Sequence, residues 1–180
     1  MKTIYSILLL LLVANTSIAQ NKYLTKSGKI TFFSSSPMED IKAENNQVLS
    51  IIDTSNGNMA ISILMKSFHF EKALMQEHFN ENYVESDKFP KATFKGKITD
   101  FESLSTLEKI SIAGTITIHG VSKQITIQAA VKKTDDLISL KGDFLVKVAD
   151  FNIEIPSVVA KNIAKEIKVS FELNHKPYKK

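Results

Sequence analysis

Apolar and polar residues alternate along most of the chain between residues 110 and 173, as they do in β-strands that turn one face toward an apolar interior. Four successive segments carry the pattern, and in each the apolar residues fall on one side. These residues are Ile110, Ile112, Ile116 and Ile118, then Ile125, Ile127, Ala129 and Val131, then Ile138, Leu140, Phe144, Val146 and Val148, and finally Ile167, Val169, Phe171 and Leu173. Because four such faces can enclose one space, the pattern predicts a closed sheet around apolar contents.

Shorter strands are predicted upstream, at residues 22–26, 28–34, 41–43 and 48–52. The Asn56-Gly57 pair predicts a hairpin turn, since both residue types tolerate positive φ. Alternation then resumes through Met59, Ile61, Ile63 and Met65, and later through Ala92, Phe94, Gly96 and Ile98. The whole chain therefore offers about eight strands, joined mostly by short antiparallel connections.

One segment has a helical period instead. Phe70 and Leu74, Leu74 and His78, and Met75 and Phe79 are each four residues apart, which predicts a helix over residues 71–79. A helix this short is marginal in water on its own, so its apolar face must pack against the sheet. Such a helix can cover an opening in a barrel.

These elements predict one all-β domain, either an antiparallel up-and-down barrel or a sandwich. A barrel of about eight strands either fills its interior with side chains or holds one small ligand there, and alternation does not separate the two cases. The absence of tryptophan and an aromatic share of 8% favour a lumen with room, because isoleucine, valine and alanine project less bulk.

The N-terminus has the pattern of a secretory leader. Lys2 precedes an apolar run at residues 7–14, and small residues precede a cleavage position between Ala19 and Gln20. The alternative, a membrane anchor, needs about 20 apolar residues, and this run is shorter. The leader also lacks a cysteine for lipid attachment. We therefore expect a signal peptide at residues 1–19, one domain at residues 20–180, and a periplasmic or secreted protein.

Composition excludes several classes of function. The chain has no cysteine, which excludes thiolate chemistry, cysteine-ligated zinc and iron–sulfur clusters. All 23 basic residues are lysines, which lack the planar fork that binds phosphate or guanine, and they are scattered among acids. Nucleic acid is therefore not an expected partner, despite the net charge of +4. The basic tail at residues 175–180 is predicted to be a solvated end, with at most transient contact to a membrane surface.

The histidines and acids form no diagnostic active-site or metal motif. His69, His78 and His119 lack the spacing of paired metal ligands, and there is no nucleophile elbow or phosphate-binding loop. We expect no metal, no other cofactor and no catalytic residue. His119 is predicted to bond backbone across its turn. His78 would lie on the covering helix, where it could meet a ligand's polar head or bond a neighbouring strand's carbonyl.

Three short motifs follow one another in the chain. They are MQEHF at residues 75–79 with FPKATF at 89–94, GTITIHGVSK at 114–123, and DFNI at 150–153 with the closing strand EIKV at 166–169. Together they resemble the YceI family over residues 28–173. The front of the chain departs from that pattern, because KITFFSSS at residues 29–36 stands where family members commonly carry a tryptophan and an Asp-x-x-His-Ser segment.

The resemblance implies an exported, lipocalin-like antiparallel barrel whose apolar tunnel holds a long isoprenoid or similar amphiphilic lipid. Our preferred hypothesis is a non-enzymatic carrier or sequestering protein for such a hydrophobic ligand. The alternative is a filled barrel that binds another envelope protein, and either hypothesis is compatible with a homodimer. The residues expected to contact the lipid are Ile61, Ile63, His78, Phe79, Phe94, Ile116, Ile118, His119, Ile127, Phe144, Val146 and Phe171.

Overall fold

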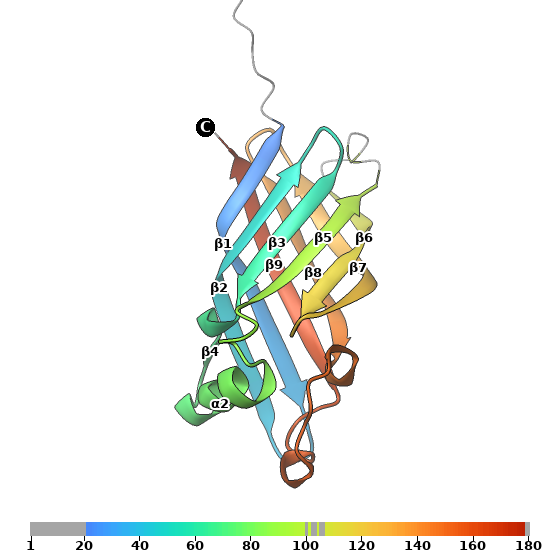
Figure 1. The fold of residues 1–180 in the computed structure, drawn as a ribbon. Coiled ribbons are helices and arrows are strands. Elements are labelled where there is room, and N and C mark those ends of the chain that lie inside the picture. Colours follow the sequence, from blue (N-terminus) through green and yellow to red (C-terminus); the bar gives the residue numbers. More distant parts are fainter. Residues whose placement is uncertain (1–20, 100, 102–103, 105–106, 179–180) are drawn as a thin grey trace, which may run out of the picture.

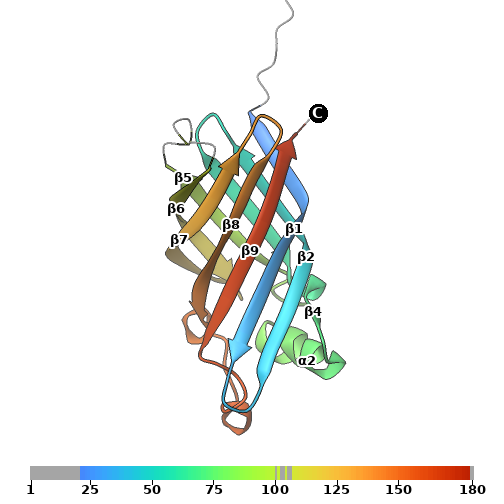
Figure 2. The same cartoon turned by 180° about the vertical axis from the view of Figure 1, so that it is seen from behind.

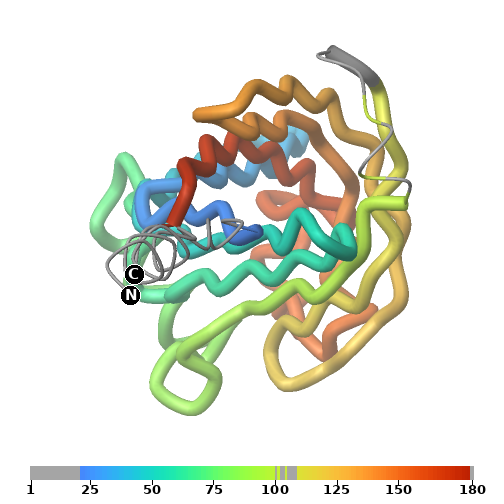
Figure 3. Tube along the Cα trace, turned by 90° about the horizontal axis from the view of Figure 1, so that it is seen from above, coloured from blue at the N-terminus to red at the C-terminus, as the bar shows by residue number. Residues whose placement is uncertain are grey.

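The chain folds into a closed antiparallel β-barrel with helical segments gathered at one end (Figure 1). The computed structural model describes residues 21–99, 101, 104 and 107–178, so the predicted leader lies outside the described residues. The strands follow the order β1-β9-β8-β7-β6-β5-β3-β2-β4, and a further β1–β2 pairing closes the sheet. Seen along the axis, the strands surround one interior (Figure 3). The predicted all-β antiparallel barrel of about eight strands with one short helix is confirmed.

The strands are β1 (Lys22–Ser35), β2 (Asp40–Asp53), β3 (Asn58–Leu64), β4 (His69–Phe70), β5 (Lys91–Ile98), β6 (Leu107–Ile118), β7 (Val121–Lys133), β8 (Ile138–Lys147) and β9 (Glu166–Pro177). The helical segments are η1 (Met65–Ser67), α2 (Ala73–His78), η2 (Phe79–Tyr83), η4 (Val148–Phe151) and η5 (Ser157–Val159). None of the helices in the described part of the chain is long and apolar enough to cross a bilayer.

The two ends of the barrel differ (Figures 1 and 2). The upper end carries the β2–β3 hairpin and the C-terminal end of β9. The lower end carries α2, the β1–β2 hairpin and the connection from β8 to β9. We use these names below for the corresponding halves of the barrel.

The first two strands are longer than predicted. Where the sequence suggested four short strands, β1 and β2 each run without a break for 14 residues. In β1 the alternation is lost at a bulge, because the register with β2 shifts on both sides of Gly28. A bulge inserts an extra residue and moves the following side chains to the opposite face. In β2 the buried Asn45 interrupts the apolar pattern, and its side-chain amide donates to the Leu64 carbonyl at 2.9 Å.

The predicted helix exists but is shorter, and a π-helical turn continues it. The α-helical part covers Ala73–His78, and η2 extends it to Tyr83. The helix has no side-chain cap at its N-terminus. The helix lies where β2 has no β3 partner, because β2 pairs with β3 only from Leu49 to Asp53. The earlier part of β2 pairs with the short strand β4 instead. The segment of residues 65–84, which contains β4 and the helix, therefore fills the gap in the barrel wall between β2 and β5.

Both predicted hairpin turns are present, but they differ in which residues have a positive φ angle. The β2–β3 hairpin turns where expected, but of Asn56 and Gly57 only the glycine has positive φ. The β6–β7 hairpin turns at His119-Gly120, where both residues have positive φ, as a two-residue type I′ turn requires.

The C-terminal tail, predicted to be a solvated end, is partly built into the barrel. Strand β9 continues to Pro177, and His175 is completely buried. The prediction was wrong for His175, which continues the inward-facing series of Phe171 and Leu173, whereas Lys176 and Tyr178 are exposed.

Candidate ligand cavity

A cavity of about 310 Å³ lies mostly in the lower half of the barrel and reaches up to Met59 near the β2–β3 hairpin. Its walls come from seven or more separate segments of the chain, and nearly every lining side chain is apolar. The barrel strands contribute Ile30, Phe32, Ile41, Met59, Ile61, Ile63, Ala92, Phe94, Ile112, Ile116, Ile118, Ile127, Phe144, Val146, Ile167, Val169 and Phe171. The site is therefore a product of strand alternation, because these are the inward-facing positions of the predicted strands.

The structure brings together nearly all residues that the sequence nominated. Ile61, Ile63, His78, Phe79, Phe94, Ile116, Ile118, Ile127, Phe144, Val146 and Phe171 all line the cavity. His119 does not line it. Whether the lining residues bind a lipid remains a prediction.

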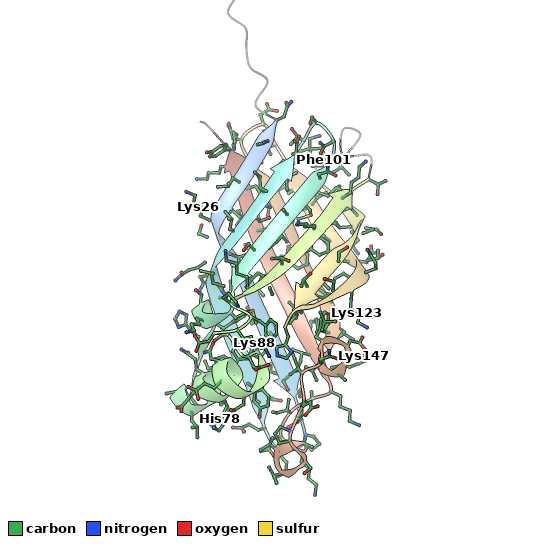
Figure 4. The ribbon with its side chains drawn as sticks, in the orientation of Figure 1. Lys26, His78, Lys88, Phe101, Lys123 and Lys147 are labelled. Atoms are coloured by element: carbon green, nitrogen blue, oxygen red, sulfur yellow. The ribbon has the colours of Figure 1, made fainter. Side chains whose placement is uncertain are left out.

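Three segments at the lower end surround the opening of the cavity. They are the β1–β2 hairpin with Glu39, the α2–η2 segment with His78 and Tyr83, and the β8–β9 connection with Asn162. His78 is exposed on α2 at this end (Figure 4), as its proposed place near a ligand's polar head requires. Polar groups thus concentrate at the opening, while the interior is apolar.

An ion pair joins two of the segments around the opening. Glu39 lines the cavity and its carboxylate lies 2.6 Å from Lys72 Nζ, which ties the β1–β2 hairpin to the start of α2. This hydrogen bond raises the pKa of Lys72. No lysine lines the cavity within the described ranges, and Lys26, Lys123 and Lys147 lie outside the barrel (Figure 4).

Aromatic packing holds the α2–η2 segment in the wall. The Phe79 ring lies 5.4 Å from the ring of Phe32 on β1, 5.6 Å from Phe68 and 5.0 Å from Phe70, centroid to centroid. These four rings also line the cavity. Sequence analysis identified Phe79 but missed the other three. The Phe68-x-Phe70 spacing before the helix was the available signal, since both rings fall on one side of an extended segment.

His119 is a structural residue beneath the β6–β7 hairpin. Its Nδ1 lies 3.1 Å from the Phe151 carbonyl oxygen and its Nε2 lies 2.7 Å from Glu85 Oε2. The ring also packs edge-on against Phe89 at 4.5 Å. The predicted backbone bond therefore exists, but it reaches the β8–β9 connection instead of crossing its own turn. The hydrogen bond from His119 is the main reason why the pKa of Glu85 is lowered, with a smaller contribution from Lys88.

Residues with a strained backbone conformation also lie around His119. Glu85, His119 and Asn152 are the non-glycine residues with positive φ in the part of the chain that the structure describes. Glu85 and His119 are bonded to each other, and Asn152 directly follows Phe151, whose carbonyl oxygen contacts the His119 ring. Positive φ costs energy for such residues, so the surrounding contacts must hold them in place. His119 therefore connects three loops at the lower end.

A second histidine, His175, forms buried hydrogen bonds in the upper half. His175 Nδ1 lies 3.0 Å from the Ile138 carbonyl oxygen, and its Nε2 lies 2.8 Å from Ser50 Oγ. Burial lowers the pKa of His175 to about 4. The neutral ring donates from Nδ1 and accepts the Ser50 hydroxyl proton at Nε2. It thereby joins β9 to β2 across the interior.

Comparison with known proteins agrees with this architecture. The family described as YceI-like domain matches residues 15–175. The chain belongs to the YceI-like family. No curated protein sequence matches it.

Solved structures extend the comparison of this YceI-like domain to three dimensions. A polyisoprenoid-binding domain from Saccharophagus degradans has a TM-score of 0.75 at 18% identity, covering 88% of this chain and 99% of its own. BcnA from Burkholderia cenocepacia has a TM-score of 0.69 at 18% identity, covering 82% and 95%. The YceI protein of Campylobacter jejuni has a TM-score of 0.59 at 18% identity, covering 76% and 85%. At these identities the likeness establishes the fold.

The motifs that carry the YceI resemblance meet in space. The first motif supplies Phe89, the second supplies His119 on the β6–β7 hairpin, and the third supplies Phe151. Gly120 allows this packing, because a Cβ atom there would lie 2.7 Å from the Phe89 ring. The motif residues around His119 therefore support the lower end of the YceI-like barrel, next to the cavity but outside it.

Proposed function

We propose that this YceI-like protein binds an amphiphilic lipid, an isoprenoid or a similar molecule, in the lower cavity and carries or sequesters it without catalysis. We further propose that it does so in the periplasm or outside the cell, after removal of residues 1–19. The observation that carries the proposal is an apolar cavity inside the barrel whose polar lining residues lie toward its opening. That distribution matches a molecule with one apolar chain and one polar head.

Burial of the chain supplies enough free energy for binding. Removing apolar surface from water contributes about 25 cal/mol per Å². A chain that buries several hundred square ångströms therefore offsets the loss of its translational and conformational freedom. No charged contact is required, which is consistent with a lining that lacks lysine in the described ranges.

The comparisons support a lipid as ligand without identifying it. One structure with this fold is described as a polyisoprenoid-binding domain. The described residues contain no cluster of three or more side chains suited to hold a metal ion. The alternative of a protein-interaction module required a filled barrel, and the cavity in the lower half argues against it.

A pair of neighbouring substitutions tests the proposal. Ile127 on β7 lines the cavity, whereas Thr126 beside it is exposed on the outer face. We expect organic extraction and native mass spectrometry of the purified protein to show a bound lipid in the wild type and in Thr126→Trp. The bulky indole of Ile127→Trp fills the cavity, so we expect that variant to carry none.

Two results would count against lipid binding. One is a wild-type protein from which no lipid is extracted and which takes up none when lipids are added. The other is an Ile127→Trp variant, folded by circular dichroism, that retains the lipid. The same native mass spectra report whether the protein is a monomer or a homodimer.

A further inference from the structure

Exposed apolar side chains lie on each of the three segments around the cavity opening. Met38 on the β1–β2 hairpin is 68% exposed, Leu74 on α2 is 59% exposed, and Val158 on η5 is 88% exposed. All three lie outside the cavity lining. Figures 1 and 2 show the hairpin and the β8–β9 connection side by side at the lowest point of the barrel. We call Met38, Leu74 and Val158 the tip cluster.

The β8–β9 connection is apolar on both of its faces. Ile153, Ile155 and Val159 line the cavity, whereas Val158 and Ala160 are exposed on the outside. Covering the cavity requires only one apolar face, and leaving a second one in water is unfavourable. Exposed apolar groups that gather at one place mark a contact with another apolar surface.

A band of alternating basic and apolar residues crosses the outer wall above the hairpin tip. Strand pairing places Phe33 of β1 between Lys42 of β2 and Lys168 of β9. It places Leu145 of β8 on the other side of Lys168. Phe33 is 38% exposed and Leu145 is 63% exposed. The four strands lie next to one another in Figure 2, and we call these four residues the wall band.

This arrangement fits a lipid bilayer better than a protein partner. The tip cluster is a set of separate protrusions, for which a protein would need a matching pocket each, whereas fluid acyl chains admit them at any spacing. Lysines of the wall band can lay their methylene groups along acyl chains and keep their ammonium groups among the phosphates.

The length of the hairpin agrees with such a contact. The loop begins at Ser36, three residues after Phe33, which is at most roughly 10 Å along an extended strand. Segments that lie in a membrane interface bury their apolar face by about 5 to 10 Å. With the wall band at the level of the head groups, the tip of the hairpin would therefore reach the first part of the acyl chains.

The charges at the lower end leave apolar insertion as the main contribution. On the hairpin, Glu39 lies 2.6 Å from Lys72 and Asp40 accepts a hydrogen bond from Ser35 at 2.8 Å. Lys168 lies 3.6 Å from Asp143. Since these charges are balanced within the protein, we expect only a modest preference for anionic lipids.

We propose that the protein docks with its lower end on the surface of a lipid bilayer, with the tip cluster among the acyl chains and the wall band among the head groups. This inference goes beyond the proposed function, because the residues of both groups lie outside the cavity lining and docking requires no bound ligand. Docking in this orientation turns the cavity opening toward the membrane. It differs from the membrane contact considered for the basic tail, since β9 ends at the upper end (Figure 1).

Single tryptophans test which end docks. The chain has no tryptophan of its own, so each introduced indole reports from one position. Met38→Trp and Val158→Trp probe the tip cluster, and Tyr178→Trp, at a residue 43% exposed at the upper end, is the control. The mature protein is mixed with vesicles of equal parts phosphatidylglycerol and phosphatidylcholine, with or without bromine on the acyl chains. We expect the emission of the two tip variants to move to shorter wavelength and to be quenched by bromine, and that of the control to stay unchanged.

Two double variants measure the contribution of the tip cluster. Met38→Asp with Val158→Asp is expected to lower the partition coefficient for these vesicles about tenfold or more, because two inserted apolar groups are replaced by charges. Leu49→Asp with Tyr178→Asp changes the net charge equally at two positions that are each 43% exposed away from the opening. We expect this control to bind like the wild type. Circular dichroism checks that both variants are folded.

Several outcomes would overturn docking at the lower end. They are an absence of vesicle binding, equal losses in the two double variants, and a spectral response at Tyr178→Trp but not at the tip variants. A shift at Met38→Trp that depends on protein concentration and not on vesicles would assign the tip cluster to contact between two copies of the chain.

The lipid extraction described above separates this inference from the proposed function. Vesicle binding by a protein that carries and takes up no lipid would leave docking in place and remove the carrier function. A protein that carries lipid but does not bind vesicles would retain the carrier function, and docking would be wrong.

Discussion

The upper and lower halves of the barrel are built from the same alternating strands, yet one is packed and the other is hollow. In the upper half β2 pairs with β3, and at the bulge around Gly28 the β1 backbone comes so close to Leu173 that a Cβ atom on Gly28 would lie 2.5 Å from it. In the lower half β2 separates from β3, and the aromatic segment at residues 65–84 completes the wall. Side chains of similar size therefore meet at the axis above and leave space below.

The difference teaches that alternation determines which side chains face inward, and that wall geometry determines whether they touch. A lining residue makes contacts on the wall side only. A residue in the packed half makes them on every side, and each lost contact reduces dispersion energy. The two halves should therefore respond differently to the same substitution.

The largest expected effect is on stability in the packed half. Ile138 and Ile127 are both buried, but only Ile127 lines the cavity. We expect Ile138→Ala to lower the free energy of unfolding by about 4 kcal/mol and Ile127→Ala by about 2 kcal/mol. Urea denaturation measures both, provided that the dependence on urea concentration is unchanged. Equal losses would mean that the two halves are packed alike.

The next effect concerns pH and again belongs to the packed half. Burial lowers the pKa of His175 to about 4, from 6.5 for a free side chain. The unfolded chain therefore binds this proton more readily, so stability is complete above pH 6.5 and falls as the pH drops toward 4. A shift of this size corresponds to a loss of about 3 kcal/mol.

His175→Gln provides the control for that pH dependence. A glutamine amide can donate to the Ile138 carbonyl and accept from Ser50, but it does not titrate. We expect urea midpoints of this variant to lack the decline that the wild type shows between pH 6.5 and 4. A decline of the same size in both proteins would assign it to other groups.

A smaller and more local effect is expected at the lower end. His119→Ala removes two hydrogen bonds that connect the β6–β7 hairpin to Glu85 and Phe151. We expect a loss of about 1 to 3 kcal/mol and faster amide hydrogen exchange near residues 85–89 and 148–153. Exchange in the upper strands should stay slow. Faster exchange throughout the barrel would show that His119 supports the whole fold and not only the lower loops.

The sequence predicted which residues face the barrel interior better than it predicted how far the cavity extends. Inward-facing residues such as Ile116 and Phe144 follow from local alternation, which requires no knowledge of the partner strands. Which inward-facing residues line the cavity could not be predicted, because Ile127 and Ile138 look alike in the sequence and only Ile127 lines it. His175 was misjudged for a related reason, since its partner Ser50 is far away in the chain. The role of Phe32, Phe68 and Phe70 depends on the incomplete β2–β3 pairing, which no local pattern reveals.

The most direct test of the account is nuclear magnetic resonance of isoleucine methyl groups in the mature protein with bound farnesol. Isoleucines occur in both halves: Ile61, Ile116 and Ile127 line the cavity, while Ile52, Ile98 and Ile138 lie in the packed half. The account predicts nuclear Overhauser contacts from the ligand to the first group and none to the second. Contacts to Ile98 or Ile138 would show that the chain passes through the upper half, and a complete lack of contacts would show that the cavity does not bind it.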